Sequence, residues 1–270
     1  MTTRLKPVTG PGHLTLDDDS ARGPHDLPNG KEAEERLAAM RARIEAVQLA
    51  LGAENRRAVL VVLQGRDASG KDGVVKKVFG DLNPAFCQVN SFKRPTPLEL
   101  RHDFLWRAHQ LVPPAGVIGI FNRSHYEDVL VVRVHKLVPD SLWKKRFDHI
   151  NDFERMLADH GVTILKFMLH VSREEQRQRL EERLADPTKN WKFEAGDLAE
   201  RTLWDQYTVA YQEMLSRTST AWAPWYVVPG DKKSVRDQLI GEIVLDTLEK
   251  LAPKYPPAAA DVLALRGTIT

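Results

Sequence analysis

The sequence has a single cysteine, Cys87, among its 270 residues, so no internal disulfide is expected. It has no apolar run near the roughly 20 residues needed to cross a bilayer, and its start, MTTRLKPVTG, lacks the apolar core of a signal peptide. It also lacks a strong charge of one sign, because 39 Lys and Arg face 37 Asp and Glu. We therefore expect a cytoplasmic globular protein with local basic sites, and neither a nucleic acid nor a membrane as its partner.

The sequence is rich in short apolar runs, which predict the strands of one sheet. Runs that are apolar at consecutive positions indicate strands buried on both faces, as in a parallel sheet covered by helices. A helix is predicted over residues 31–51, where apolar residues recur at spacings of three and four. We predict an α/β fold, a doubly wound five-stranded parallel sheet flanked by helices. The predicted strands are 58–64, 87–92, 116–122, 162–171 and 225–230.

The beginning of the chain and one long connection depart from this alternation. Residues 1–29 are rich in proline and glycine and show no hydrophobic period, which predicts an extended or loosely docked N-terminal arm before a single domain, residues 30–270. More than fifty residues separate the fourth and fifth predicted strands. Two helices, about 172–185 and 197–217, are predicted there, and we interpret the segment of about 172–217 as a lid insertion.

The stretch GRDASGKDG, residues 65–73, follows the first predicted strand directly. The spacing G-x-x-x-x-G-K between a buried strand and a helix is typical of a phosphate-binding P-loop. Its glycines let backbone N–H groups converge on phosphate oxygens, and the helix N-terminus and the lysine add positive charge. A glycine-rich turn with an incidental lysine is the alternative. The predicted phosphate-binding residues of this loop are Gly65, Ala68, Ser69, Gly70 and Lys71.

Two aspartates in this loop predict a bound metal. Asp72 replaces the usual Ser or Thr, and Asp67 lies inside the loop. A carboxylate among those amides repels phosphate unless a cation lies between them, so Asp67 predicts Mg²⁺ at the site. Asp72 falls in the first helical turn, where a negative charge is favourable without any catalytic role. We therefore expect Asp67 to bind the metal and Asp72 to stabilise the helix end.

The third predicted strand ends in FNRSHYED, residues 121–128. Asn122 stands where P-loop kinases usually have an acidic residue beside the metal, and it offers a neutral oxygen. Arg123 is expected to face the same crevice and to bind phosphoryl oxygens, with a surface ion pair as the alternative. Ser124 and Glu127 form a capping box that predicts a helix through YEDVLVVRV. Glu127 is thus either a helix cap alone or also a metal ligand.

Further cations predict a path for a polyanion. Lys76 lies on the P-loop helix, Lys93 lies in SFKRPT after the second strand, and Arg133 lies in the segment after FNRSHYED. Each of them alone is also explained by a solvated surface. In the lid, the i,i+4 spacing of Arg179 and Arg183 puts both on one helix face, from which they are expected to close over phosphates.

The tip of the predicted lid, DPTKNWKFEAG, carries a cation and two aromatic residues. Lys189 is expected to contact phosphate. Trp191 is expected to stack on a nucleobase, and packing of Trp191 and Phe193 within the lid is the alternative.

Together, these motifs resemble those of the polyphosphate kinase 2 family, whose members move phosphoryl groups between inorganic polyphosphate and nucleotides. The resemblance implies a P-loop kinase fold related to thymidylate kinase, with a helical lid. It also implies Mg²⁺, with Mn²⁺ as a substitute, and a homo-oligomer, a dimer or tetramer. The motifs that carry it span about residues 55–250 and are GRDASGKDG, SFKRPT, FNRSHYE, SREEQRQRLEERLADPTKNWKF and WDQY.

The resemblance also implies roles for single residues. Many members have an aspartate where this chain has Asn122 and an asparagine where it has Glu127. This paired departure resembles the subgroup that accepts both AMP and ADP, with Glu127 supplying the missing metal charge. The predicted catalytic residues are Asp67, Lys71, Arg123 and Arg179 or Arg183. The predicted nucleotide-binding residues are Asp67, Asn122, Arg123 and Trp191, and the predicted metal ligands are Asp67, Asn122 and Glu127.

The reaction predicted from these residues is reversible phosphoryl transfer from polyphosphate to AMP or ADP, giving ADP or ATP. A phosphate oxygen of the nucleotide attacks the terminal phosphorus in line, while cations neutralise the charge. An ATP-dependent nucleoside monophosphate kinase on the same fold is the nearest alternative. A regulatory P-loop switch is a further one, although the guanine-reading motif N-K-x-D is absent from the sequence.

Overall fold

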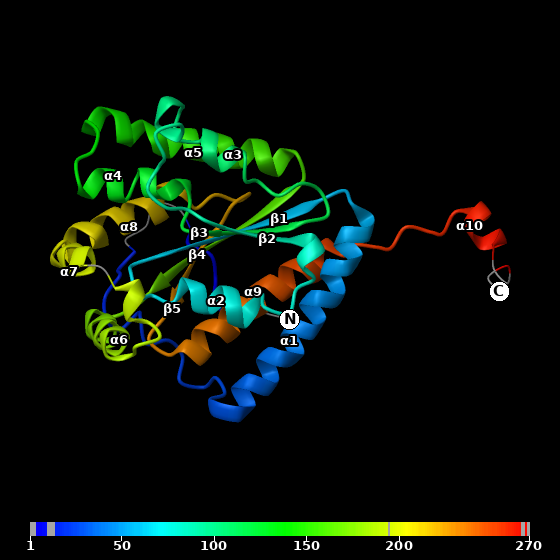
Figure 1. Ribbon diagram of the computed structural model, residues 1–270, viewed down its shortest axis with the longest axis horizontal. Coiled ribbons are helices and arrows are strands. Elements are labelled where there is room, and N and C mark those ends of the chain that lie inside the picture. Colours follow the sequence, from blue (N-terminus) through cyan, green and yellow to red (C-terminus); the bar gives the residue numbers. More distant parts are fainter. Residues whose placement is uncertain (1–3, 10–13, 194, 266–267, 269–270) are drawn as a thin grey trace.

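Five parallel strands form the centre of the protein in the order β2-β3-β1-β4-β5. The structure is a computed structural model that describes residues 4–9, 14–193, 195–265 and 268. The sheet lies between two layers of helices (Figure 1), which confirms the predicted fold class. The strands are β1 (Ala58–Gly65), β2 (Cys87–Ser91), β3 (Ile118–Asn122), β4 (Val162–His170) and β5 (Trp225–Pro229).

The central strand β1 shows why consecutive apolar residues form this kind of sheet. All eight of its residues are buried. Because side chains alternate along a strand, Leu60 and Val62 belong to one hydrophobic core and Val59 and Val61 to the other. Both faces of β1 therefore pack against helices, and water reaches neither of them.

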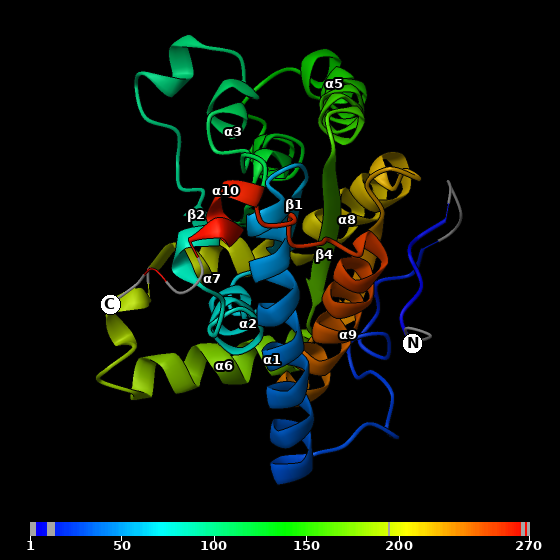
Figure 2. The ribbon, with the colours of Figure 1, turned by 90° about the vertical axis from the view of Figure 1, so that its right-hand side faces the viewer.

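One layer of helices comprises α1, α2 and α9, and the other comprises α3, α4, α5 and α8 (Figures 1 and 2). The first layer is α1 (Gly30–Glu54), α2 (Lys71–Val78) and α9 (Lys233–Leu251). The second is α3 (Trp106–His109), α4 (Val131–Val134), α5 (Asp140–Asp159) and α8 (Trp204–Thr218). Short 3₁₀ turns complete the chain at η1 (Pro84–Phe86), η2 (Glu99–Arg101), η3 (His125–Asp128) and η4 (Asn190–Lys192).

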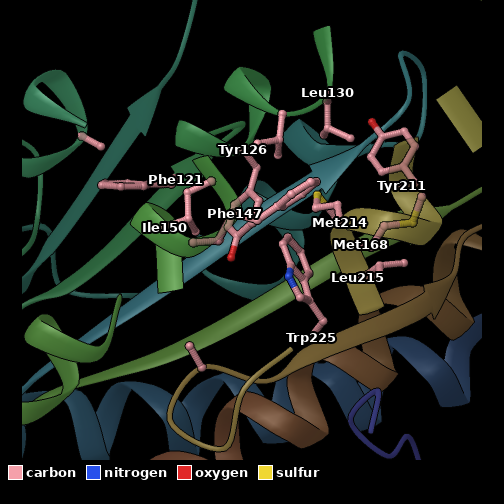
Figure 3. Packing of buried hydrophobic residues seen from close by; sticks show 14 of the residues in the cluster. Phe121, Tyr126, Leu130, Phe147, Ile150, Met168, Tyr211, Met214, Leu215 and Trp225 are labelled. Carbon is pink, nitrogen blue, oxygen red and sulfur yellow. The ribbon is translucent and has the colours of Figure 1, made fainter. Parts of the chain in front are cut away.

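Aromatic side chains fill the core on the α5 and α8 side (Figure 3). Tyr126 and Trp225 meet edge to face with ring centroids 4.8 Å apart, and Phe121 and Phe147 are fully buried in the same cluster. Tyr126 follows β3 by a few residues, so this packing fixes the segment that leaves the sheet next to the predicted phosphate site.

The segment after β3 differs from its prediction. Ser124 does cap a helical turn, and its Oγ accepts from the backbone N–H of Tyr126 at 3.2 Å. The turn is the short 3₁₀ helix η3, however, and not the start of one long helix through Val134. The chain then continues into the separate short helix α4, and Tyr126 and Val129 are both buried in the core.

The predicted lid region contains α6 (Arg173–Ala185) and α7 (Ala195–Thr202) before α8. The helix predicted over 197–217 is therefore two helices, which meet at Leu203. Glu194, in the predicted lid tip, lies outside the described residues. Together, α6 and α7 lie beyond the carboxyl ends of the strands (Figure 1).

The described part of the N-terminal arm lies against the body. Leu16, Ala21 and Leu27 are buried, and the backbone N–H of Val8 donates to the carbonyl of Trp225 at 2.8 Å. Residues 1–3 and 10–13 of the predicted arm lie outside the described residues. At the other end of the chain, α10 (Ala260–Ala264) stands apart from the body (Figure 1). No described helix has the length and apolar character needed to cross a membrane.

Candidate active site

The site lies where β1 and β3 end side by side. Leu63 of β1 is paired with Asn122 of β3, and the backbone N–H of Arg123 donates to the carbonyl of Leu63 at 3.0 Å. Parallel neighbours end at the same edge of a sheet, so the loop after β1 and the turn after β3 meet there. The predicted P-loop and FNRSHYED are thus brought together.

Backbone conformations in the loop after β1 require particular residues. Gly70 has φ +96°, just before α2 begins at Lys71. A Cβ at this position would stand 2.0 Å from Nη1 of Arg236, so both the backbone and the space demand glycine. Ala68 also has a positive φ, +61°, and alternation of this kind makes the concave backbone nests that bind anions.

Lys71 folds back over this loop. Its Nζ donates to the carbonyl oxygens of Gly65 at 2.7 Å and Arg66 at 3.1 Å. Burial, together with the nearby charge of Arg123, lowers the pKa of the Lys71 ammonium to about 8. A bound anion would reverse this effect, because it favours the protonated form.

Arg123 lies between two carboxylates. It forms an ion pair with Oδ1 of Asp67, and its Nη1 lies 3.7 Å from Oε2 of Glu127. Burial works against the charged guanidinium, but Glu127 and Asp67 outweigh burial and raise the pKa of Arg123. Burial also raises the pKa of the Glu127 carboxyl, although Arg123 and Lys71 oppose the change. Arg123 thus joins the two carboxylates, and the ammonium of Lys71 lies close enough to feel the charge of all three.

Asn122, the third predicted metal ligand, is held by Asp72. Its Nδ2 donates to Oδ1 of Asp72 at 2.8 Å, which leaves the amide oxygen on the other side of the group. The side-chain amide of Gln64 lies between Ser124 and Glu127. When its oxygen accepts from Ser124, its nitrogen donates to Oε1 of Glu127 at 3.0 Å. In the part of the chain that the structure describes, no three His, Cys, Asp or Glu side chains gather as a metal site.

The two predicted lid arginines lie in different environments. Arg179 is buried, and its guanidinium donates to the backbone carbonyls of Ala68 at 3.1 Å and Gly230 at 2.6 Å. Arg183 is half-buried and lies 3.4 Å from a carboxylate oxygen of Asp197 on α7. Arg179 is thus bound to the P-loop itself, and Arg183 joins α6 to α7.

The remaining predicted cations lie further from the loop. Lys76 and Lys93 are exposed, and Arg133 pairs with Glu213 at 2.7 Å. At the lid tip Lys189 pairs with Asp186 at 2.5 Å. Trp191 is 74% exposed, and its ring nitrogen donates to a carbonyl within the tip. The ion pairs of Arg133 and Lys189 thus join them to Glu213 and Asp186, and not to the P-loop.

Several residues that hold the loop were not singled out from the sequence. Arg66, inside the P-loop, stacks on Trp204 with its guanidinium carbon 3.8 Å from the ring centroid, and it donates to Oγ1 of Thr208 at 2.5 Å. Gln176 of α6 donates to the carbonyl of Asp67 at 3.0 Å, and Arg236 of α9 lies against the loop. Arg236 stands among other charged residues in the sequence of α9, so no sequence signal singled it out.

A P-loop follows β1, and it faces an arginine at the end of β3, the strand that pairs with β1 in the sheet. This arrangement defines a P-loop phosphotransferase. The sequence pattern of the family described as Polyphosphate kinase 2 matches residues 28–256. The chain belongs to this family, which confirms the predicted resemblance.

Relatives of known name agree with this assignment. The chain is 54% identical over 241 residues, 89% of its length and 88% of the relative's, to an AMP/ADP-polyphosphate phosphotransferase of Meiothermus ruber. It is 46% identical over 226 residues, 79% of its length and 78% of the relative's, to an ADP-polyphosphate phosphotransferase of Rhodopseudomonas palustris. The crystal structure of polyphosphate kinase 2 from Arthrobacter aurescens TC1 superimposes with a TM-score of 0.85 at 38% identity and covers 99% of both chains.

Proposed function

We propose that the protein transfers the terminal phosphoryl group of inorganic polyphosphate to AMP and ADP, reversibly, giving ADP and ATP. One observation carries the proposal: Asp67, Lys71 and Arg123 meet over an anion-binding backbone at the ends of β1 and β3. Family membership and the names of the relatives support polyphosphate and adenine nucleotides as the substrates.

The chemistry needs positioned charge more than covalent help. A nucleotide phosphate is already ionised at neutral pH, so its oxygen attacks the terminal phosphorus of polyphosphate without a general base. Loop amides and Lys71 hold phosphate oxygens, and Arg123 stabilises the charge that spreads over the transferred group. In the ligand-free protein Asp67 neutralises Arg123; on binding, substrate phosphates replace the carboxylate as its partner.

The residues present fit Mg²⁺ bound together with phosphates, and Mn²⁺ as its substitute. Mg²⁺ is usually held by one or two carboxylates plus substrate phosphates, not by a cage of protein ligands alone. Asp67 and Glu127 supply the carboxylates, and Asn122 supplies a neutral oxygen. When bound, the ion would neutralise charge on the facing phosphates.

The acceptor is proposed to be AMP as well as ADP. Asn122 and Glu127 are the two departures from the commoner family pattern, and Glu127 is close to Arg123 in the structure. The Meiothermus ruber relative, at 54% identity, is named for both nucleotides, whereas the Rhodopseudomonas palustris relative is named for ADP. We also propose that α6 and α7 close over the phosphates as a lid, with Arg183 and Lys189 facing the polyanion.

Purified protein incubated with Mg²⁺, polyphosphate and either AMP or ADP tests the proposal. We expect ADP and ATP from AMP, and ATP from ADP, identified by anion-exchange chromatography. Replacing polyphosphate by ATP as the donor is the matched control. Phosphorylation of AMP by ATP but not by polyphosphate would favour the nucleoside monophosphate kinase and reject this proposal.

Two further proposals concern the setting of the enzyme. We place it in the cytoplasm, where adenine nucleotides are available as acceptors. We also propose a homo-oligomer, a dimer or tetramer, on the strength of family membership. Light scattering after size exclusion would contradict the second proposal if it gave the 30.6 kDa mass of one chain.

A further inference from the structure

The carbonyl groups of the P-loop are held from outside by side chains of distant elements. The carbonyl of Asp67 accepts from Gln176 Nε2 at 3.0 Å. That of Ala68 accepts from Nη1 of Arg179 at 3.1 Å. That of Ser69 accepts from Arg179 and from Arg236, both at 3.3 Å. Three consecutive peptide carbonyls are thus bound by side chains of α6 and α9. The N–H of Ser69 donates to the carbonyl of Arg66 at 3.1 Å, so the neighbouring N–H groups, those of Ala68 and Gly70, are the ones considered for an anion.

The orientation of these carbonyls sets the orientation of the amides. In a trans peptide the C=O and the N–H of one plane point in opposite directions. The N–H groups of Ala68 and Gly70 share planes with the carbonyls of Asp67 and Ser69. Side chains that fix those carbonyls therefore aim the two N–H groups at the opposite side, where an anion is bound.

Arg236 is the most deeply placed of these side chains. It is 2% exposed, and its Nε and Nη2 lie 2.8 and 2.7 Å from Oδ1 of Asp237. Its guanidinium fills the space beside Gly70, where a Cβ would be 2.0 Å away, and beside Gly73, at 3.2 Å. A buried guanidinium is costly to desolvate, and packing alone would be served by an apolar residue.

Arg179 ties the same loop to the other side of the site. Besides Ala68 and Ser69 it binds the carbonyls of Gly230, at 2.6 Å, and Asp231, at 3.0 Å. These two residues connect β5 to α9, the helix that carries Arg236. One hydrogen-bonded unit therefore joins the P-loop, α6 and the start of α9.

We propose that Arg236 is a positioning residue for the phosphate site and that it acts together with Arg179 and Gln176. It orients the loop amides before substrate arrives and adds a fixed positive charge behind them, without touching the reacting atoms. The inference rests on the proposed function only for the identity of the polyphosphate chain. It extends to any phosphate that the loop binds.

The test compares Arg236→Met and Arg236→Lys with the wild type. Titration calorimetry with inorganic tripolyphosphate and Mg²⁺ gives the Kd, and steady-state kinetics gives kcat and KM. We expect Arg236→Met to raise the Kd by about tenfold or more, as loss of an outer support does at other preorganised sites. Arg236→Lys keeps the positive charge but loses the planar set of N–H donors. Its Kd should therefore lie between those of the wild type and of Arg236→Met.

Arg36→Met is the matched control. Arg36, on α1, forms an ion pair with Glu242 of α9, so this variant also removes an arginine that packs against α9. Its Kd should stay within about twofold of the wild type. A folded Arg236→Met protein, with a thermal transition above the assay temperature and a wild-type Kd, would overturn the inference. If Arg236→Met does not fold, the Kd values of Arg236→Lys and Asp237→Asn for tripolyphosphate are measured instead. A wild-type Kd in both folded variants would overturn the inference.

Two outcomes separate this inference from the proposed function. Wild-type protein that binds tripolyphosphate but transfers no phosphoryl group from polyphosphate refutes the function, and the Kd of Arg236→Met still tests the inference. Wild-type protein that transfers the group, with an equal Kd in Arg236→Met, refutes the inference alone. Because both arginines bind the carbonyl of Ser69, the effects of Arg179→Gln and Arg236→Met should not add; additive effects would contradict the joint action.

Discussion

Arg123 has a backbone conformation that is uncommon for a residue with a long side chain. Its φ is +61°, in the left-handed region that costs free energy for any residue but glycine. The backbone hydrogen bond to Leu63 and the cap at Ser124 hold it there. The conformation aims the side chain at Asp67 and Glu127, and the strain is consistent with selection for the site and not for stability.

Asp67→Asn tests the proposed metal-binding role of Asp67 against its neighbour Asp72. The change removes a charge but keeps the shape, and we expect kcat with Mg²⁺ and polyphosphate to fall at least about a hundredfold, the size of losing one preorganised charge. Asp72→Asn is the matched variant, since the amide oxygen still accepts from Asn122, and its kcat should fall less than about tenfold. Equal losses in the two variants would contradict the assignment of the metal to Asp67.

The lowered pKa of Lys71 predicts a pH dependence of phosphate binding. In the free protein burial places this pKa near 8; a bound anion raises it, because the complex favours the ammonium. Affinity is therefore fully present below about pH 8 and is lost as the pH rises, with Kd increasing by about tenfold for each pH unit well above 8.

Titration calorimetry with tripolyphosphate between pH 7.5 and about 9.5 measures this effect. Lys71→Arg is the control, because a guanidinium stays charged throughout the range, and its Kd should be nearly flat. A wild-type Kd that is equally flat would show that Lys71 binds phosphate without taking up a proton.

At the scale of single residues, the sequence predicted the site residues that follow the ends of β1 and β3. It did not predict Arg236, which holds the P-loop from α9. Asp67, Lys71 and Arg123 follow buried strands within a few positions, so the parallel sheet itself brings them together. Arg236 lies far along the chain and meets Ser69 only through the packing of α9. No local pattern encodes this long-range contact, and Arg236 does not stand out among the other charged residues of α9.

Elements on the α5 side are joined by a buried ionic cluster. Nζ of Lys166, on β4, lies 2.5 Å from Oε2 of Glu154 on α5 and 2.7 Å from the hydroxyl of Tyr126. It also donates to the carbonyl of Thr218 at the end of α8, at 2.7 Å. Lys166 and Glu154 are fully buried. The cluster therefore links three elements and the turn that follows Arg123 (Figure 3 shows Tyr126 in this core).

Lys166→Met should destabilise the protein strongly. Removing the ammonium leaves Glu154 as a buried carboxylate that keeps only His125 and the hydroxyl of Tyr126 as partners, and loss of the ion pair costs about 3–5 kcal/mol of the free energy of unfolding. Adding Glu154→Gln should restore part of the loss, because the second charge is then gone. Lys250→Met is the control: its partner Asp246 lies 2.6 Å away, but the lysine is 74% exposed, and the cost should be below about 1 kcal/mol. Urea denaturation measures all four proteins, and equal losses in the two single variants would contradict the argument.

The strands were predictable because burial on both faces leaves a continuous apolar run, as in β1. The segment after Ser124 was not, because S-x-x-E fits a helix start equally well whether the chain continues as α-helix or as one 3₁₀ turn. Tyr126 is buried against Trp225, and a local motif cannot report a contact between residues about a hundred positions apart. The split between α7 and α8 likewise depends on tertiary packing, since Trp204, at the start of α8, stacks with Arg66.

In the whole molecule, the N-terminal arm runs across α8 and the carboxyl ends of β4 and β5. The carbonyl of Leu14 accepts from Gln212 on α8 at 2.8 Å. The carbonyl of Asp17 lies 2.7 Å from Nε2 of His170, and that of Ala21 accepts from the N–H of Asp231 at 3.1 Å. The arm thus fastens α8 to the carboxyl ends of β4 and β5, beside the loop that Arg179 holds. Proline and glycine predicted an extended segment, but its docking depends on partners far along the chain.

Deletion of residues 1–22 should therefore lower the stability of the whole protein. The deletion removes the buried side chains of Leu16 and Ala21 and exposes the surface against which they pack. It also removes the hydrogen bonds of the Leu14, Asp17 and Ala21 carbonyls. Burying one leucine contributes about 2 kcal/mol and each hydrogen bond about 1 kcal/mol, so we expect the melting temperature to fall by about 10 °C. Deletion of residues 256–270 is the matched control, because the described residues of this tail are exposed where their side chains are placed, and it should move the melting temperature by less than about 2 °C. Differential scanning calorimetry decides, and equal shifts would mean that the arm adds no stability of its own.

The same deletion should weaken phosphate binding. Ala21 accepts from the backbone N–H of Asp231, beside the carbonyls that Arg179 binds. Loss of the arm should therefore raise the Kd for tripolyphosphate, whereas loss of residues 256–270 should leave that Kd unchanged.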